Sequence, residues 1–97
     1  MGYYYATKRL GSRSGSVVLY IPKEWNITPD VDVSFIFWTG GEKMPSTPYK
    51  LRVTPKKMNK EGAVGIYVPS AYAPLIPDDK LITICIITGE DGGDGNA

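Results

Sequence analysis

The amino-acid sequence predicts a mostly β protein, a pseudo-twofold β barrel made of two internal repeats with very short helices. Segments 15–25 (GSVVLYIPKEW) and 62–72 (GAVGIYVPSAY) share Gly, Val, Tyr and Pro at an offset of 47 residues. Pro29 and Pro77, at an offset of 48, each precede an acidic turn and an apolar strand. A repeat of this kind indicates an architecture in which each unit buries the apolar face of the other.

The expected strands follow from β-branched, aromatic and apolar runs. The first three are expected at 3–10, 17–21 and 31–38, and the second three at 49–53, 64–68 and 81–87. The last run is nearly all apolar, as in a strand that is buried on both faces. Pro22 and Pro69 suit the first turn of a helix, and each is followed by room for only one or two turns.

The domain organisation follows from the repeat. Residues 1–88 form one domain, with repeat one at 3–38, a linker at 39–48 and repeat two at 49–88. The linker holds two glycines and two prolines, which is typical of a loop. Residues 89–97 (GEDGGDGNA) are expected to be a disordered acidic tail.

Composition restricts the function. The 97-residue chain has no histidine and a single cysteine, so His-based metal sites and Ser-His or Cys-His nucleophiles are excluded. We expect no enzyme, no catalytic residue, no metal and no cofactor. No stretch approaches the roughly 20 apolar residues of a membrane span, so a cytoplasmic protein without a membrane partner is expected. The absence of Gln and His beside abundant Tyr and Ile favours a thermophilic source.

Eight of the eleven basic residues lie in the two segments, or arms, that precede the repeat glycines. No acidic residue occurs in 1–23 or 48–60. If a twofold relates the arms, both basic clusters lie on one face, as in a nucleic-acid binder. The predicted DNA-binding residues are Lys8, Arg9, Arg13, Lys50, Arg52, Lys56, Lys57 and Lys60.

Within that set the arginines are the candidates for base edges, because a guanidinium binds guanine with two hydrogen bonds. Loop residues Gly11, Ser12, Ser14 and Gly15 are expected to mould to a groove. A simpler interpretation stays open, since lysines on strand edges also confer solubility and block edge-to-edge aggregation.

Several other residues have a plain structural interpretation. Tyr3, Tyr4 and Tyr5 are expected to alternate between core and surface, although tyrosines can also stack on bases. Trp25 and Tyr72 are expected to plug the barrel ends. Cys85 is expected to be a small buried apolar residue, and the Asp pairs after Pro29 and Pro77 to serve turns.

The segments 20–24 (YIPKE) and 27–33 (ITPDVDV) resemble the AbrB/MazE-type swapped-hairpin family of small transcription regulators and antitoxin DNA-binding domains. The steps Lys8-Arg9-Leu10 and Lys56-Lys57-Met58 are similar to the basic-basic-apolar step before that family's glycine. The resemblance covers about 3–38 and 49–87 and implies a swapped-hairpin barrel, usually a dimer, whose two halves are here fused in one chain.

The resemblance implies a transcriptional regulator that contacts duplex DNA through the basic arms of both repeats. The family's helix arginines have no counterpart here, which keeps open an antitoxin-like or assembly protein-interaction module without DNA binding. The acidic tail 90–94 would suit a basic protein partner. A structural β subunit of a larger assembly is a third interpretation. The chain is expected to be a monomeric pseudo-dimer or a homodimer.

The first prediction concerns the second arm. Duplex DNA of random sequence should bind with an affinity that falls steeply with salt, because lysines displace counterions from phosphates. Replacing Lys56 and Lys57 together by alanine should abolish that binding. A titration at two salt concentrations measures it, and flat, negligible binding of the parent chain at low salt would exclude duplex DNA as the ligand.

Overall fold

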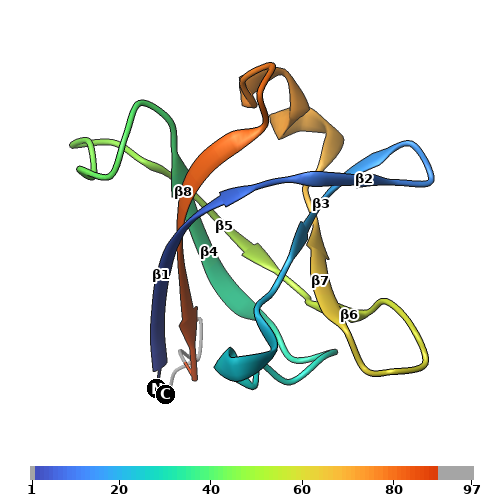
Figure 1. Ribbon diagram of the computed structural model, residues 1–97. Coiled ribbons are helices and arrows are strands. Elements are labelled where there is room, and N and C mark those ends of the chain that lie inside the picture. Colours follow the sequence, from blue (N-terminus) through green and yellow to red (C-terminus); the bar gives the residue numbers. More distant parts are fainter. Residues whose placement is uncertain (1, 90–97) are drawn as a thin grey trace.

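The computed structural model describes residues 2–89 and is mostly β, with two antiparallel four-stranded sheets (Figure 1). Sheet A contains, in spatial order, β1 (Gly2–Arg9), β8 (Leu81–Thr88), β4 (Val33–Trp38) and β5 (Tyr49–Val53). Sheet B contains β2 (Gly11–Arg13), β3 (Ser16–Tyr20), β7 (Val64–Tyr67) and β6 (Lys56–Lys57). The strands are paired as two sheets and not as one closed cylinder. The tail expected at 89–97 lies, beyond Gly89, outside the described residues.

In both sheets, exchanging the two halves of the chain leaves the strand order unchanged. At the centre of sheet B, Leu19 pairs with Ile66. On either side of that pair, the Ile21 N–H donates to the Val64 carbonyl and the Val68 N–H to the Val17 carbonyl, each at 2.9 Å. The two bonds are equivalent, because Ile21 and Val68 correspond at the 47-residue offset, as do Val17 and Val64. The sequence match at this offset therefore reflects two equivalent strands that lie side by side.

Each arm crosses from sheet A to sheet B (Figure 1). Leu10 alone separates β1 from β2, and Thr54 and Pro55 separate β5 from β6. Leu10 and Pro55 are buried at these corners, and the Leu10 N–H donates to the Lys80 carbonyl at 2.8 Å. A buried corner residue lets one continuous arm serve as an edge strand of both sheets.

The prediction that residues 11–15 form an adaptable loop is wrong. Residues 11–13 form β2, and Ser14 and Gly15 make a tight turn into β3 with φ values of 52° and 82°. Positive φ at both central residues is typical of a type I′ turn, whose twist matches that of the flanking strands. The segment is therefore a hairpin with a fixed register, in which Arg13 pairs with Ser16.

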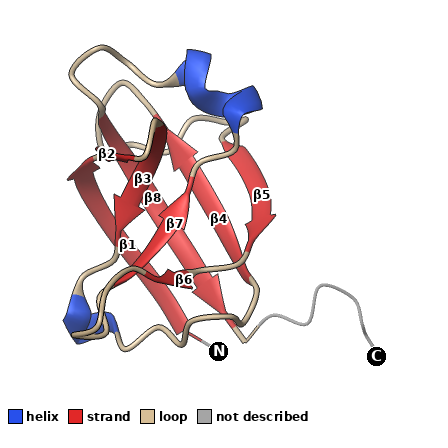
Figure 2. Cartoon of the chain, turned by 90° about the vertical axis from the view of Figure 1, so that its right-hand side faces the viewer, coloured by secondary structure: helices blue, strands red, loops and turns tan. Residues whose placement is uncertain are grey.

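The two helices are single short 3-10 segments, η1 (Lys23–Trp25) and η2 (Ser70–Leu75). Each begins directly after a proline, and the two lie at opposite ends of the molecule (Figures 1 and 2). Trp25 stacks on Tyr4 at 5.2 Å between ring centroids, and Tyr72 meets Tyr49 edge-on at 6.4 Å. Trp25 and Tyr72 are partly buried against the core. The two helices thus present equivalent aromatic contacts to the arms. Among residues 2–89, no helix has the length and apolar composition needed to cross a bilayer.

The core lies between the two sheets. It contains Phe35 and Phe37 from β4, the central pair of sheet B, and three isoleucines of β8: Ile82, Ile84 and Ile86. As predicted, β8 is largely buried on both faces. The linker accounts for the burial of outer-face residues at one end of sheet A. The Gly41 carbonyl in this loop accepts hydrogen bonds from Trp38 Nε1 at 2.8 Å and from Thr83 Oγ1 at 3.1 Å. Loop 39–48 therefore covers one end of sheet A.

The central pair generates the second prediction. Ile66 has no exposed area, so Ile66→Ala should lower the free energy of unfolding by about 2–5 kcal/mol, and Ile66→Val by about 0.5–1.5 kcal/mol. Leu75→Ala on the exposed part of η2 is the control and should have a much smaller effect. Urea unfolding measures all three, and equal losses for Ile66→Ala and Leu75→Ala would contradict the assignment.

Candidate nucleic-acid interface

The two basic arms are equivalent in topology but not in the positions of their charges. Gly11 pairs with Val18, and Lys56 pairs with Gly65. Val18 and Gly65 correspond at the 47-residue offset, so Lys56 is the equivalent of Gly11 and not of Lys8. The proposed correspondence of Lys8-Arg9-Leu10 with Lys56-Lys57-Met58 is therefore wrong. Lys8 and Arg9 are the last two residues of β1 in sheet A, whereas Lys56 and Lys57 form β6 in sheet B and Met58 follows directly.

The predicted single basic face is also wrong, because each arm crosses between the sheets. Four of the eight predicted residues lie on the sheet B side: Arg13, Lys56, Lys57 and Lys60. Four lie in sheet A: Lys8, Arg9, Lys50 and Arg52. We call the outer surface of sheet B, together with hairpins β2–β3 and β6–β7, the hairpin face. The outer surface of sheet A is called the platform.

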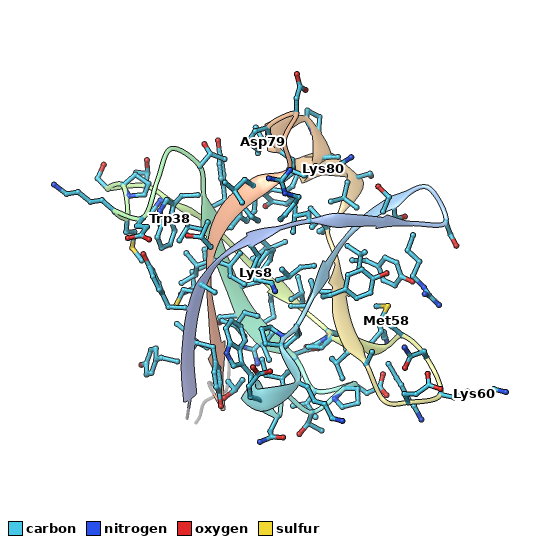
Figure 3. All side chains as sticks on the ribbon, in the orientation of Figure 1. Lys8, Trp38, Met58, Lys60, Asp79 and Lys80 are labelled. Atoms are coloured by element: carbon cyan, nitrogen blue, oxygen red, sulfur yellow. The ribbon has the colours of Figure 1, made fainter. Side chains whose placement is uncertain are left out.

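Both hairpins project on the same side of the molecule, at the right of Figure 1. The β6–β7 turn is ordered by Asn59, whose carbonyl accepts from the Gly62 N–H at 3.2 Å. The Asn59 side chain accepts from the Ala63 N–H at 3.1 Å. Lys60 extends outward from this turn (Figure 3). The two hairpin tips therefore form a pair of fixed projections with basic residues on both.

Arg13 is held in place on the hairpin face. Its guanidinium donates to the Met58 carbonyl at 2.9 Å, which spans sheet B from β2 to the end of β6. Hydrogen bonds with Tyr20, first, and with Tyr67 raise the pKa of Arg13 above its ordinary value. The group itself remains at the surface, while Val18 on the same face is fully buried. Arg13 thus combines a fixed position with access to solvent.

Two glycines make room for this arrangement. A Cβ on Gly11 would lie 3.1 Å from Cε2 of Tyr20, and one on Gly65 would lie 3.0 Å from Cε of Met58. Both contacts are tighter than ordinary van der Waals packing. The absence of a side chain at these two strand positions therefore lets Tyr20 and Met58 lie flat on the sheet beside Arg13.

Sequence reasoning overlooked Tyr20 and Tyr67 as members of a site. The signal was present, because the same residue type recurs at the 47-residue offset on the solvent-facing side of a strand. Both tyrosines are about two-fifths exposed. A tyrosine hydroxyl is not needed for packing in a core. The recurrence of tyrosine at two exposed positions therefore indicated a polar role for these side chains.

Acidic residues approach the hairpin face at one edge. Lys56 Nζ lies 3.2 Å from Oδ1 of Asp30, and both side chains are largely exposed. Asp32 accepts a hydrogen bond from the Thr54 hydroxyl nearby. Asp30 has a φ of 67°, a left-handed conformation in which Asp and Asn are tolerated better than most residues. At the other turn Asp79 accepts from the Leu81 N–H at 2.9 Å, which fits the predicted turn role of these acids.

The other four basic residues are dispersed in sheet A. Strand register places three of them on the platform: Arg9, Lys50 and Arg52. The residues next to them along β1 and β5 face inward, and on β5 these are Leu51 and Val53 of the core. Lys8 is half-buried and belongs to the inner side of β1, between β1 and β3 in Figure 3. Lys8 is therefore separated from the residues with which it was grouped.

The chain matches no protein-family model, no curated protein and no solved structure with which it was compared. Its function therefore has to follow from its own surfaces.

Cys85 generates the third prediction. It lies half-buried on the platform side of β8, where burial raises the pKa of its thiol above the ordinary value. The unfolded chain therefore releases this proton first as pH rises, and the free energy of unfolding should fall above the ordinary thiol pKa. Urea unfolding across that pH range, with Cys85→Ala as the control, measures the difference. An identical pH dependence in both chains would contradict it.

Proposed function

We propose that this protein is a duplex-DNA-binding transcriptional regulator of the swapped-hairpin, AbrB-like type, with both halves of the pseudo-dimer fused in one chain. The fold part is supported by the strand order of both sheets, which is unchanged when the two halves are exchanged. It is also supported by the arms, each of which continues from sheet A into sheet B and so links the two sheets.

The observation that carries the DNA proposal is the held guanidinium of Arg13. Met58, Tyr20 and Tyr67 accept hydrogen bonds from part of a planar group that has five N–H donors directed outward in its plane. The remaining donors suit a guanine edge or a phosphate, both of which accept two parallel hydrogen bonds. Because Arg13 is already ordered, less side-chain entropy is lost when it binds.

The hairpins supply the surrounding positive charge. Lys57 and Lys60 lie on the β6–β7 hairpin, and neither is engaged in an ion pair among the described residues. Lys60 extends from the turn and would contact a phosphate beside Arg13. Lys57 pairs with Val64, whose side chain packs against the core, so its ammonium group would contact a phosphate at the edge of the hairpin. The β2–β3 hairpin, which projects from the molecule, is a two-stranded ribbon, and the major groove of B-DNA is wide enough for such a ribbon.

The fourth prediction tests charge and position separately. Arg13→Ala, Lys57→Ala and Lys60→Ala should each reduce the slope of log affinity against log salt by about 0.9, the value for one neutralised phosphate. Tyr20→Phe combined with Tyr67→Phe keeps all charges and both rings but removes the hydroxyls that hold Arg13. This double variant should bind more weakly with an unchanged slope. Fluorescence anisotropy with a labelled random duplex measures each affinity.

Two further variants serve as internal checks. Asp30→Asn removes the ion pair of Lys56 while keeping a residue that tolerates the left-handed backbone, so it should raise the duplex affinity. Lys43→Ala removes one positive charge from loop 39–48, which lies at the left of Figure 1, away from the hairpins, and should leave the slope unchanged. Negligible binding of the parent chain at low salt would overturn the proposal in favour of a protein-interaction module. Equal effects of Lys43→Ala and Lys60→Ala would show that the duplex does not bind preferentially at the hairpin face.

A further inference from the structure

The platform combines exposed aromatic rings and positive charges on an antiparallel sheet. Strand register gives two rows of side chains across the four strands. One row is Tyr3, Ile87, Ser34 and Arg52, and the next is Tyr5, Cys85, Ile36 and Lys50. Each row therefore begins with a tyrosine at the β1 edge and ends with a cation at the β5 edge.

The two tyrosines are among the most exposed large side chains of the described residues, Tyr3 at 68% and Tyr5 at 53%. They are two residues apart on one strand, so they stand on the same face about 7 Å from each other. The Tyr5 hydroxyl donates to the Glu42 carbonyl at 2.6 Å, and its ring is tilted over Trp38 at a centroid distance of 6.0 Å. Tyr5 is thus positioned by loop 39–48 with part of its ring still open.

Tyr5 is explained in part by its contacts with loop 39–48, whereas Tyr3 keeps most of its ring in solvent. Their neighbour Tyr4 points inward and stacks on Trp25, so the contribution of β1 to the core is already made by that residue. The floor between the tyrosines and the cations is formed by the half-buried Ile36 and Cys85 in one row and by the buried Ser34 and Ile87 in the other. A flat, partly apolar floor beside exposed rings suits a planar ligand better than it suits bulk water.

The charges on this surface have one sign. The four strands of sheet A contain Lys8, Arg9, Lys50 and Arg52 and no acidic residue. Lys50 and Arg52 stand on β5, about 14 Å from the tyrosines across three strand spacings. Arg9 lies farther along β1 on the same face. Among the described residues, the acids nearest in sequence are Asp32, directly before β4, and Asp79, two residues before β8. Asp32 accepts a hydrogen bond from the Thr54 hydroxyl, and Asp79 accepts one from the Leu81 N–H.

We infer that the platform binds an unpaired nucleic-acid strand, with bases stacked on Tyr3 and Tyr5 and phosphates held by Lys50 and Arg52. Stacking is available to every base, whereas the bases of a duplex are stacked on one another and present only their edges in the grooves. One class of RNA-recognition module stacks bases on aromatic residues of a four-stranded sheet. The ligand chemistry is shared by single-stranded DNA and RNA.

This inference goes beyond the duplex-binding function proposed above. The platform and the hairpin face lie on opposite sides of the core, at the left and right of Figure 1. A bound single strand on one side therefore leaves the other side free for a duplex. The two activities should be separable by mutation and should not compete.

The fifth prediction uses the full chain with labelled 15-nucleotide oligo(dT) and oligo(U), read by fluorescence anisotropy. Tyr3→Leu and Tyr5→Leu should each weaken binding by about 5- to 150-fold, because each removes one stacking ring. Tyr3→Phe keeps the ring and should bind as the parent chain does. Lys50→Ala with Arg52→Ala should lower the salt slope by about 0.7 for each phosphate that is no longer neutralised.

Lys23→Ala in η1 is the charge control and should leave oligonucleotide binding within about 2-fold. Thermal unfolding of Tyr3→Leu verifies that the fold is retained, which its 68% exposure leads us to expect. Equal weakening by Tyr3→Phe and Tyr3→Leu, or no oligonucleotide binding by the parent chain, would overturn the inference. An unlabelled duplex that displaces the oligonucleotide would also overturn it. Duplex binding that disappears with Arg13→Ala while oligonucleotide binding persists would leave the two proposals independent.

Discussion

The pairing of β3 with β7 is the contact on which the rest of the structure depends. Leu19 and Ile66 meet at its centre, have no exposed area, and belong one to each half of the chain. Neither half has enough apolar surface to form a core alone, so this pairing creates the interior into which β4 and β8 also pack. Because β3 and β7 are central, β2 and β6 become the edges of sheet B, and the tips of both hairpins are brought to one side.

The crossing of the arms has the largest consequence for function. An arm that contributes to both sheets distributes its charges over opposite surfaces, and a sequence cluster is thereby divided. Arg9 and Arg13 are four residues apart, yet the buried corner at Leu10 places them in different sheets. Each surface nevertheless receives cations from both arms, because the arms enter each sheet at opposite edges. Two separate basic surfaces replace the single one that a linear view of the chain predicts.

The two surfaces differ in how their cations are ordered. On the hairpin face, Arg13 is fixed by two tyrosine hydroxyls and a backbone carbonyl, so position is the distinctive property of that guanidinium. On the platform, the ordered elements are the rings, since Tyr5 is anchored to loop 39–48 through its hydroxyl. The linker, which by composition only joins two repeats, also covers one end of sheet A through hydrogen bonds from Trp38 and Thr83 to Gly41.

The sequence by itself determined the strands, the short helices and the equivalence of the two halves, because these follow from local patterns: period-2 alternation, proline placement and a repeated segment. Strands β2 and β6 escaped notice because segments of three and two residues carry no periodicity. Only the tertiary structure decided which cations share a surface, since that depends on corners at Leu10 and Pro55 whose direction no local pattern encodes. It also decided that Arg13 is held, because its partners Tyr20, Met58 and Tyr67 come from three other strand regions and meet it only through sheet register.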